Sequence, residues 1–218
     1  MHLVPIPFLI ITVTLLIRAE FHRDKRQIYL WKPLSTLLVI AVALLSLLTP
    51  GAVVAFTCWI TVGLVLSLGG DIALMFDSKR AFLIGLVLFL LAHVVYAIGL
   101  TIFNGFHSQD LIVGALLLAV GLALYAYLKP GLDGMQGPVL LYVLVILFMV
   151  NRAISTFWGT TFTVTQTWLL SLGAVLFMLS DVVLAINRFR HPFAANRFGL
   201  YLYYGGQLFI ALSLSYFG

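Results

Sequence analysis

Two aspartates stand inside apolar runs that are long enough to cross a bilayer, where an ionisable side chain is costly and usually functional. Asp71 follows LVLSLGG and Asp181 follows AVLFMLS. Counted along a helix from the polar residues that end each run, both carboxyl groups lie about 9–10 Å below the same membrane face. If they converge, repulsion and desolvation favour a protonated acid beside a carboxylate base. The alternative is that each aspartate binds neighbouring helices at separate places.

Polar side chains lie deeper in the same segments. His93 and Gln207 lie about 18 and 14 Å from that face. Tyr96 follows His93 at i+3, and Tyr203 and Tyr204 precede Gln207 by one helical turn. We expect these residues either to bind a substrate or to hold the helices together by hydrogen bonds.

The sequence does not favour a metal centre, a cofactor or a serine nucleophile. It contains one cysteine, Cys58, and neither HExxH nor GxSxG. Lys32 is the best candidate to hold a lipid phosphate, because Pro33 marks the expected start of a helix and would fix where this cation enters the membrane. The alternative is that Lys32 only anchors the topology.

The composition indicates which scaffold must position these residues. Of the 218 residues, 63% are hydrophobic and 9% are charged, and the mean hydropathy is +1.15. A soluble fold would lack the charge to cover its surface, so a water-soluble enzyme and a disordered chain are both excluded. We predict an all-α polytopic membrane bundle that forms a single integral membrane domain over 1–218. Eight transmembrane helices are expected, near 3–18, 33–48, 52–76, 81–102, 111–128, 138–154, 167–187 and 198–217.

The positive charges are placed asymmetrically. All lysines and arginines except Arg152 fall near the connections between spans 1–2, 3–4, 5–6 and 7–8. This predicts that these four connections lie in the cytoplasm and that both termini lie outside, in a bacterial inner (plasma) membrane. It also accounts for the net charge of +5 without a nucleic-acid partner. The sequence leaves the oligomeric state open.

The third and fourth expected helices resemble the seventh and eighth. Residues 64–76 align with 174–186 at an offset of 110, and a loop four residues longer extends the match. We therefore predict a parallel internal repeat with halves near 1–105 and 106–218. The alignment pairs Asp71 with Asp181, Gly63 with Gly173, Gly85 with Gly199, Phe89 with Tyr203 and His93 with Gln207.

Five short motifs resemble those of the YhhN-like lysoplasmalogenases, in order and spacing over essentially the whole chain. They are Lys32-Pro33, GDIALM (70–75), IGLVLFLLAHVVY (84–96), LSDVVLAINRF (179–189) and YYGGQLFIALS (203–213).

The resemblance implies an enzyme that hydrolyses the vinyl-ether bond of lysoplasmalogens, releasing a fatty aldehyde and glycerophosphoethanolamine or glycerophosphocholine. It implies that Asp71, in the GD motif, and Asp181, in the SD motif, are catalytic. Vinyl ethers hydrolyse through proton transfer to carbon and an oxocarbenium-like cation, which suits an acid–carboxylate pair. With the phosphate near the basic connections, we expect the alkenyl tail to run past His93 and Tyr96.

Three other functions stay open. A transporter or proton-coupled carrier also uses membrane carboxylates and repeats, although its site is expected at the midplane rather than near one face. A non-catalytic lipid-binding protein would have the same topology. Hydrolysis of a different ether or ester lipid is the third.

Overall fold

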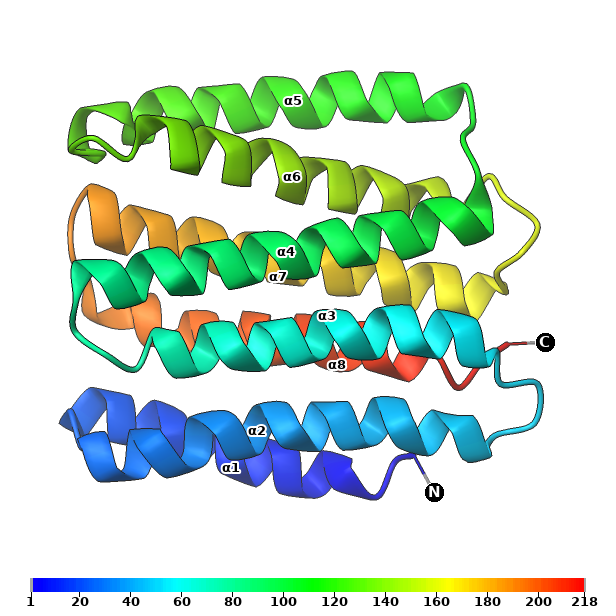
Figure 1. Cartoon of the computed structure of the whole chain (residues 1–218), viewed down its shortest axis with the longest axis horizontal. Coiled ribbons are helices and arrows are strands. Elements are labelled where there is room, and N and C mark those ends of the chain that lie inside the picture. Colours follow the sequence, from blue (N-terminus) through cyan, green and yellow to red (C-terminus); the bar gives the residue numbers. More distant parts are fainter. Residues whose placement is uncertain (1, 218) are drawn as a thin grey trace.

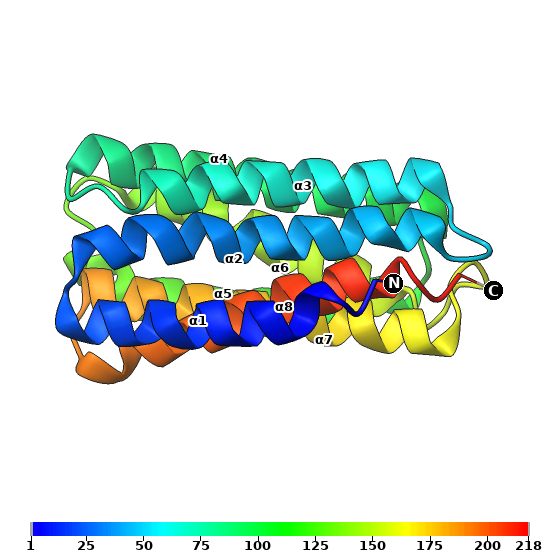
Figure 2. The same ribbon diagram turned by 90° about the horizontal axis from the view of Figure 1, so that it is seen from below.

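The computed structural model describes residues 2–217, which form eight α-helices and no strands. The helices run up and down beside one another, as Figures 1 and 2 show. Seven of them are long and apolar enough to cross a bilayer, and the eighth, α8, is shorter. The predicted all-α polytopic membrane bundle is therefore confirmed. The helices are α1 (Pro5–His22), α2 (Lys25–Leu45), α3 (Val54–Ala73), α4 (Lys79–Asn104), α5 (Gln109–Leu128), α6 (Gln136–Ser155), α7 (Val164–Phe189) and α8 (Gly199–Ser213), with short 3₁₀ helices at Ser46–Leu48, Lys129–Gly131 and Ala194–Phe198.

The start of α2 differs from the sequence expectation. The helix begins at Lys25, where the Asp24 side chain accepts hydrogen bonds from the backbone N–H groups of Arg26 and Gln27. This N-cap satisfies donors that would otherwise lack partners, so the helix starts two turns before Pro33. The expectation that Pro33 opens this helix was wrong. Lys32 accordingly lies inside the bundle and is buried.

The two ends of the bundle differ in charge. The described ends of the chain, near residues 2 and 217, lie at the same end of the bundle (Figure 1). The connections that follow α1, α3, α5 and α7 lie at the opposite end, and Lys79, Lys129, Arg190 and Arg197 are in or beside them. We call this the basic end. Its assignment to the cytoplasm stays a prediction.

The helix packing has a repeated pattern. The pairs α1–α2, α2–α3 and α3–α4 are packed together, and so are α5–α6, α6–α7 and α7–α8. Helix α2 of the first half also packs against α8 of the second, as α6 packs against α4. This is the arrangement that two four-helix halves in a parallel repeat require, and it supports the predicted repeat, which stays a prediction.

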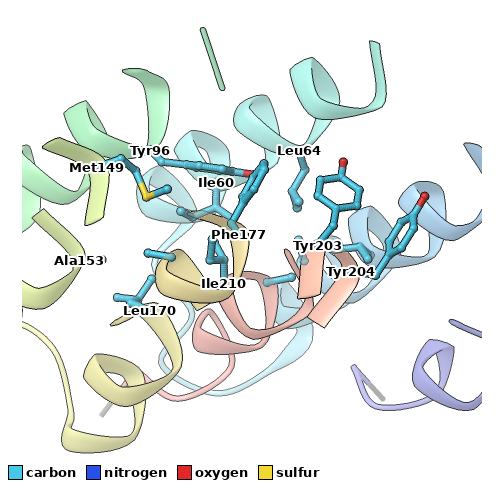
Figure 3. Close-up of a cluster of buried hydrophobic side chains, with 14 of the residues drawn as sticks. Ile60, Leu64, Tyr96, Met149, Ala153, Leu170, Phe177, Tyr203, Tyr204 and Ile210 are labelled. Carbon is cyan, nitrogen blue, oxygen red and sulfur yellow. The ribbon is translucent and has the colours of Figure 1, made fainter. Parts of the chain in front are cut away.

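The core brings α4, α7 and α8 together around aromatic side chains. The ring of Phe177 lies 5.2 Å from that of Tyr203 and 6.1 Å from that of Phe89. Figure 3 shows Phe177 and Tyr203 in this buried cluster. Helices α7 and α8 approach closely at Gly206, where a Cβ atom would lie 2.7 Å from the carbonyl oxygen of Gly173. Small residues at such a crossing let membrane helices pack backbone to backbone.

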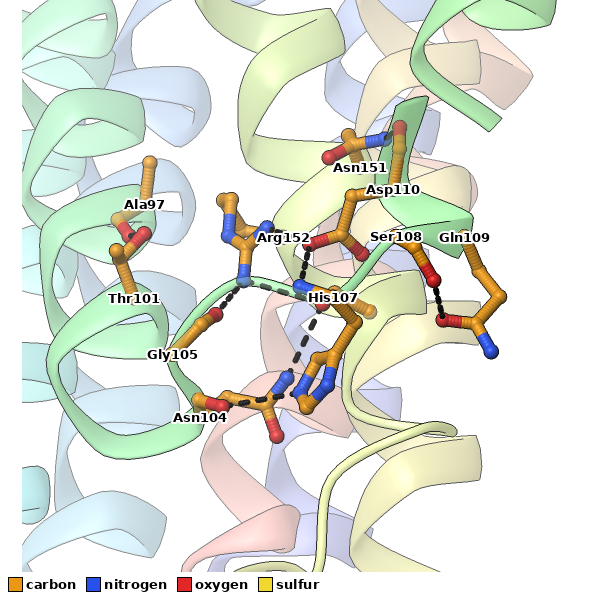
Figure 4. A network of polar contacts seen from close by, with 11 residues as sticks. Ala97, Thr101, Asn104, Gly105, His107, Ser108, Gln109, Asp110, Asn151 and Arg152 are labelled. Carbon is orange, nitrogen blue, oxygen red and sulfur yellow. Dashed lines mark hydrogen bonds and ion pairs between the residues drawn. The ribbon is translucent and has the colours of Figure 1, made fainter. Parts of the chain in front are cut away.

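A buried ion pair lies at the end of the bundle away from the basic connections. Arg152, in the last turn of α6, is fully buried and its Nη1 lies 2.6 Å from Oδ2 of Asp110 at the start of α5. Its second amino group donates to Ser155 and to the carbonyl of Gly105, and the backbone N–H of His107 donates to Asp110 (Figure 4). The network ties the α4–α5 connection to α6.

Candidate active site

Asp71 is held by side chains from two other helices, α2 and α8. It lies in the last turn of α3 and is 2% exposed. Its Oδ2 accepts hydrogen bonds from Thr36 of α2 at 2.6 Å and from Tyr203 of α8 at 2.8 Å. The ammonium of Lys32 lies 3.8 Å from the other oxygen. A buried carboxylate needs such a countercharge and such donors, so this arrangement suits the ionised form.

Lys32 is itself fixed by α8. The Tyr204 hydroxyl donates to the carbonyl of Lys32 at 3.0 Å and also lies 3.4 Å from the Thr36 hydroxyl. Three of the residues predicted for the site, Lys32, Tyr203 and Tyr204, are therefore brought to Asp71. Lys32 reaches Asp71 from inside α2. The sequence singled out Lys32 because Pro33 was expected to start a helix, and that reason was wrong.

Asp181 has a different environment. It lies in α7, about two turns before that helix ends at the basic end. The Tyr142 hydroxyl of α6 donates to its Oδ2 at 2.6 Å, and Nε2 of His93 lies 3.9 Å from the same oxygen. Within the described residues no lysine or arginine nitrogen comes within 4.0 Å of Asp181. The two aspartates thus differ, since Asp71 has a lysine as a counterion while the basic side chain beside Asp181 is a histidine.

His93 is fully buried beside this carboxyl group. Its ring lies 5.4 Å from that of Tyr142 and 4.6 Å from that of Phe177. Neither ring nitrogen has a hydrogen-bond partner among the described side chains and backbone. His93 therefore lies at the site, and whether it binds substrate stays a prediction.

Tyr96 and Gln207 are connected to Tyr203 by hydrogen bonds. The Tyr96 hydroxyl donates to the Gln207 carbonyl oxygen at 3.0 Å, and the Gln207 amide donates to the Tyr203 hydroxyl at 3.4 Å. This chain of hydrogen bonds orients the tyrosine that donates to Asp71. The structure thus gives both residues partners within the bundle, and direct substrate binding by them stays a prediction.

Both aspartates line one cavity of about 420 Å³ that lies toward the basic end of the bundle. Lys32 and Tyr203 line it beside Asp71, and cationic side chains of Lys79, Arg188 and Arg197 also line it. We call it the polar cavity. It combines a positive rim, suited to a phosphate, with two carboxyl groups further in.

The rim also carries two acidic groups, Glu20 and Asp77. Asp77 lines the polar cavity from the α3–α4 connection, and its Oδ2 lies 2.6 Å from the ammonium of Lys25. The hydrogen bond and charge of Lys25 hold the pKa of the Asp77 carboxyl below its usual range. This exposed pair therefore adds no net charge to the rim.

Sequence reasoning missed two partners of the aspartates, Tyr142 and Thr36. Thr36 follows Lys32 by one helical turn, so it belongs to the same face of α2. Tyr142 follows Lys32 by 110 residues, the offset that aligns the two aspartates. Extending the repeat to α2 and α6 would have found it, because each of these residues contacts the aspartate of its own half.

No group of three or more His, Cys, Asp or Glu side chains within residues 2–217 is arranged to hold a metal ion. The chemistry available to the described site is that of two carboxyl groups, three tyrosines, a histidine and a lysine.

Comparisons with known proteins give the family of this chain. The model of the YhhN family matches residues 27–214. The chain is 33% identical over 162 residues to the lysoplasmalogenase TMEM86A of Bos taurus and 33% identical over 160 residues to that of Homo sapiens. Each match covers 71% of this chain, and the chain spans 64% of the length of these curated relatives. No solved structure matches it. With the family model matched over most of its length, the chain belongs to the YhhN family.

Proposed function

We propose that this protein is a membrane-embedded hydrolase that cleaves the vinyl-ether bond of lysoplasmalogens to a fatty aldehyde and glycerophosphoethanolamine or glycerophosphocholine. The observation that carries the proposal is that Asp71 and Asp181, from separate helices, open into one polar cavity with a cationic rim. The relatives named lysoplasmalogenase support the substrate class. We also propose that the protein lies in a bacterial inner (plasma) membrane with both termini outside, because the asymmetry of its positive charges favours this orientation.

The substrate is placed by its phosphate. Lys79, Arg188 and Arg197 attract the headgroup phosphate to the rim of the polar cavity. The glycerol and the vinyl ether then extend inward to the carboxyl groups. Binding energy from the headgroup thus helps to hold the reacting carbons beside the acid.

The two aspartates take different roles. Asp181 has no lysine or arginine counterion, and in its protonated form it transfers a proton to the β-carbon of the vinyl ether. Asp71, held ionised by Lys32, stabilises the resulting oxocarbenium-like cation and takes a proton from the attacking water. Water adds to the α-carbon, and the hemiacetal collapses to aldehyde and alcohol as the C–O bond to glycerol breaks. One water is consumed, and no oxidant or metal is required.

The direct test uses the full chain purified in detergent micelles. Lysoplasmenylethanolamine and lysoplasmenylcholine are added, and fatty aldehyde is followed over time. In D₂O the aldehyde should carry one deuterium on the carbon next to the carbonyl, because the proton goes to carbon. The saturated 1-O-alkyl analogue should yield no aldehyde. If folded protein releases no aldehyde from either headgroup, the proposal is wrong.

A carrier is the second candidate, because two membrane carboxyl groups line one cavity. In proteoliposomes a carrier would move the lysophospholipid across the membrane without converting it. Hydrolysis requires aldehyde to appear in stoichiometric amount with the loss of substrate. Measuring both quantities in the same vesicles separates the two functions.

The hydroxyl of Tyr142 should matter for turnover. Tyr142→Phe removes the 2.6 Å hydrogen bond to Asp181 and leaves the ring in place. Asp181 becomes a carboxylate as it transfers its proton, and a hydrogen bond to a charged group contributes about 1.5–3 kcal/mol, so we expect kcat to fall about tenfold or more. Tyr125→Phe is the matched control, because the Tyr125 hydroxyl donates to the Gln136 carbonyl away from both aspartates. Equal turnover in the two variants would argue against a role for Tyr142.

A further inference from the structure

A second cavity, of about 260 Å³, adjoins the polar cavity between α4, α5, α6 and α7. Among its lining residues only Tyr142 and Asp181 carry polar side-chain groups. We call it the apolar cavity. The two cavities share five lining residues, so the carboxyl group of Asp181 lies where they meet. The shared residues are Leu74, Phe82, Phe89, Asp181 and Leu184.

The apolar cavity spans several helical turns, from Leu128 and Phe189 at the basic end to Leu147 near the middle of α6. Asp181 lies within this span, and Met178 lines the cavity one turn earlier in α7, on the side away from the basic end. The cavity therefore continues into the depth at which the hydrocarbon chain of a membrane lipid lies.

The apolar cavity also reaches the outer surface of the bundle. Val120 of α5 lines it and is 66% exposed. In a membrane this surface faces the lipid hydrocarbon. A hydrocarbon chain can therefore pass from the bilayer into the apolar cavity without crossing water.

We infer that the apolar cavity binds the single hydrocarbon tail of a lysophospholipid whose headgroup occupies the polar cavity. The inference rests on the proposed function and adds the subsite that selects the tail. A dry apolar cavity of about 150 Å³ holds one benzene molecule, so the volume here suits a segment of one chain. The ether bond joins headgroup and tail, and Asp181 lies at the corresponding junction of the two cavities.

Gly121→Val tests the tail subsite. A Cβ at Gly121 would meet the Leu147 and Val143 side chains, both of which line the apolar cavity, so the larger residue displaces Leu147 into it. We expect the rate ratio of an octadecenyl to an octenyl lysoplasmalogen to fall about tenfold, since small volume changes in an apolar pocket have effects of this size.

Gly114→Val is the matched control on the same helix. It lies one heptad earlier on α5, its nearest neighbour would be the Asn151 amide at 3.4 Å, and it does not line the cavity. The chain-length ratio should be unchanged in this variant. If Gly121→Val does not fold, Ala185→Leu fills the same cavity from α7 and carries the same expectation.

Binding separates this inference from the proposed function. The probes are a saturated 1-O-octadecyl lysophospholipid and its 1-O-octyl counterpart, which cannot be hydrolysed as vinyl ethers. If the wild type releases no aldehyde but the cavity-filling variants weaken octadecyl binding selectively, the tail subsite stands and the proposed function fails. If aldehyde is released but chain-length preference and binding are unchanged in both cavity-filling variants, the tail subsite is wrong and the proposed function stands.

Discussion

Asp181→Asn is expected to reduce aldehyde release by about 10²–10⁴-fold, the contribution typical of a general acid. The amide keeps the shape of the carboxyl group but cannot transfer a proton to carbon. Because no lysine or arginine pairs with Asp181, its replacement leaves no lysine or arginine unpaired, and the protein should remain folded. Steady-state kinetics with lysoplasmenylethanolamine, beside an unfolding midpoint in detergent, measure both effects.

Asp71→Asn should reduce turnover to a similar extent, but it carries a structural cost. The substitution leaves the buried ammonium of Lys32 without its carboxylate. The double variant Lys32→Met with Asp71→Asn removes that unpaired charge, so it should recover stability while activity stays lost. Recovery of turnover in the double variant would show that Asp71 has only a structural role.

Asp133→Asn is the matched control for both substitutions. Asp133 lies exposed in the α5–α6 connection, with a positive φ of 37° that asparagine tolerates well. Its turnover should equal that of the wild type. Near-normal turnover in both Asp71→Asn and Asp181→Asn would overturn the two-aspartate mechanism.

The second large effect is expected on stability, from Arg152→Met. Arg152 is fully buried and paired with Asp110, with Ser155 and the Gly105 carbonyl as further acceptors (Figure 4). Removing one partner of a buried ion pair leaves an uncompensated charge and costs about 3–5 kcal/mol. For a chain of this size that corresponds to a drop of about 10 °C in the unfolding midpoint. Thermal unfolding in detergent measures it.

Two comparisons test the cause of this loss. The double variant Arg152→Met with Asp110→Asn removes both charges and should be more stable than Arg152→Met alone. Asp77→Asn breaks the exposed pair with Lys25, and because water screens that pair we expect no measurable shift. A double variant no more stable than the single one would mean that packing around Arg152, rather than its charge, supports this end of the bundle.

Hydropathy and charge were sufficient to predict the scaffold. Apolar runs are a local property of the chain, and each run must form a helix in lipid because its backbone groups have no other partners. The order of the helices, and the depth of Asp71 and Asp181 near one end, followed from these runs and their lengths. Boundaries were less accurate. The start of α2 depends on the Asp24 cap. Asp24 lies among several other charged residues, so the sequence did not identify it as an N-cap.

Only the tertiary structure decided what each aspartate contacts. Tyr142 and Asp181 are 39 residues apart and Tyr203 and Asp71 are 132 apart, so their hydrogen bonds depend on how α6, α7, α3 and α8 pack. The pattern of residues within one helix contains no information about contacts between residues so far apart in the sequence. The same holds for the apolar cavity, whose walls come from four helices. The sequence determined that two carboxyl groups lie in a membrane, and packing decided that one is paired with a lysine while the other lies between a polar cavity and an apolar one.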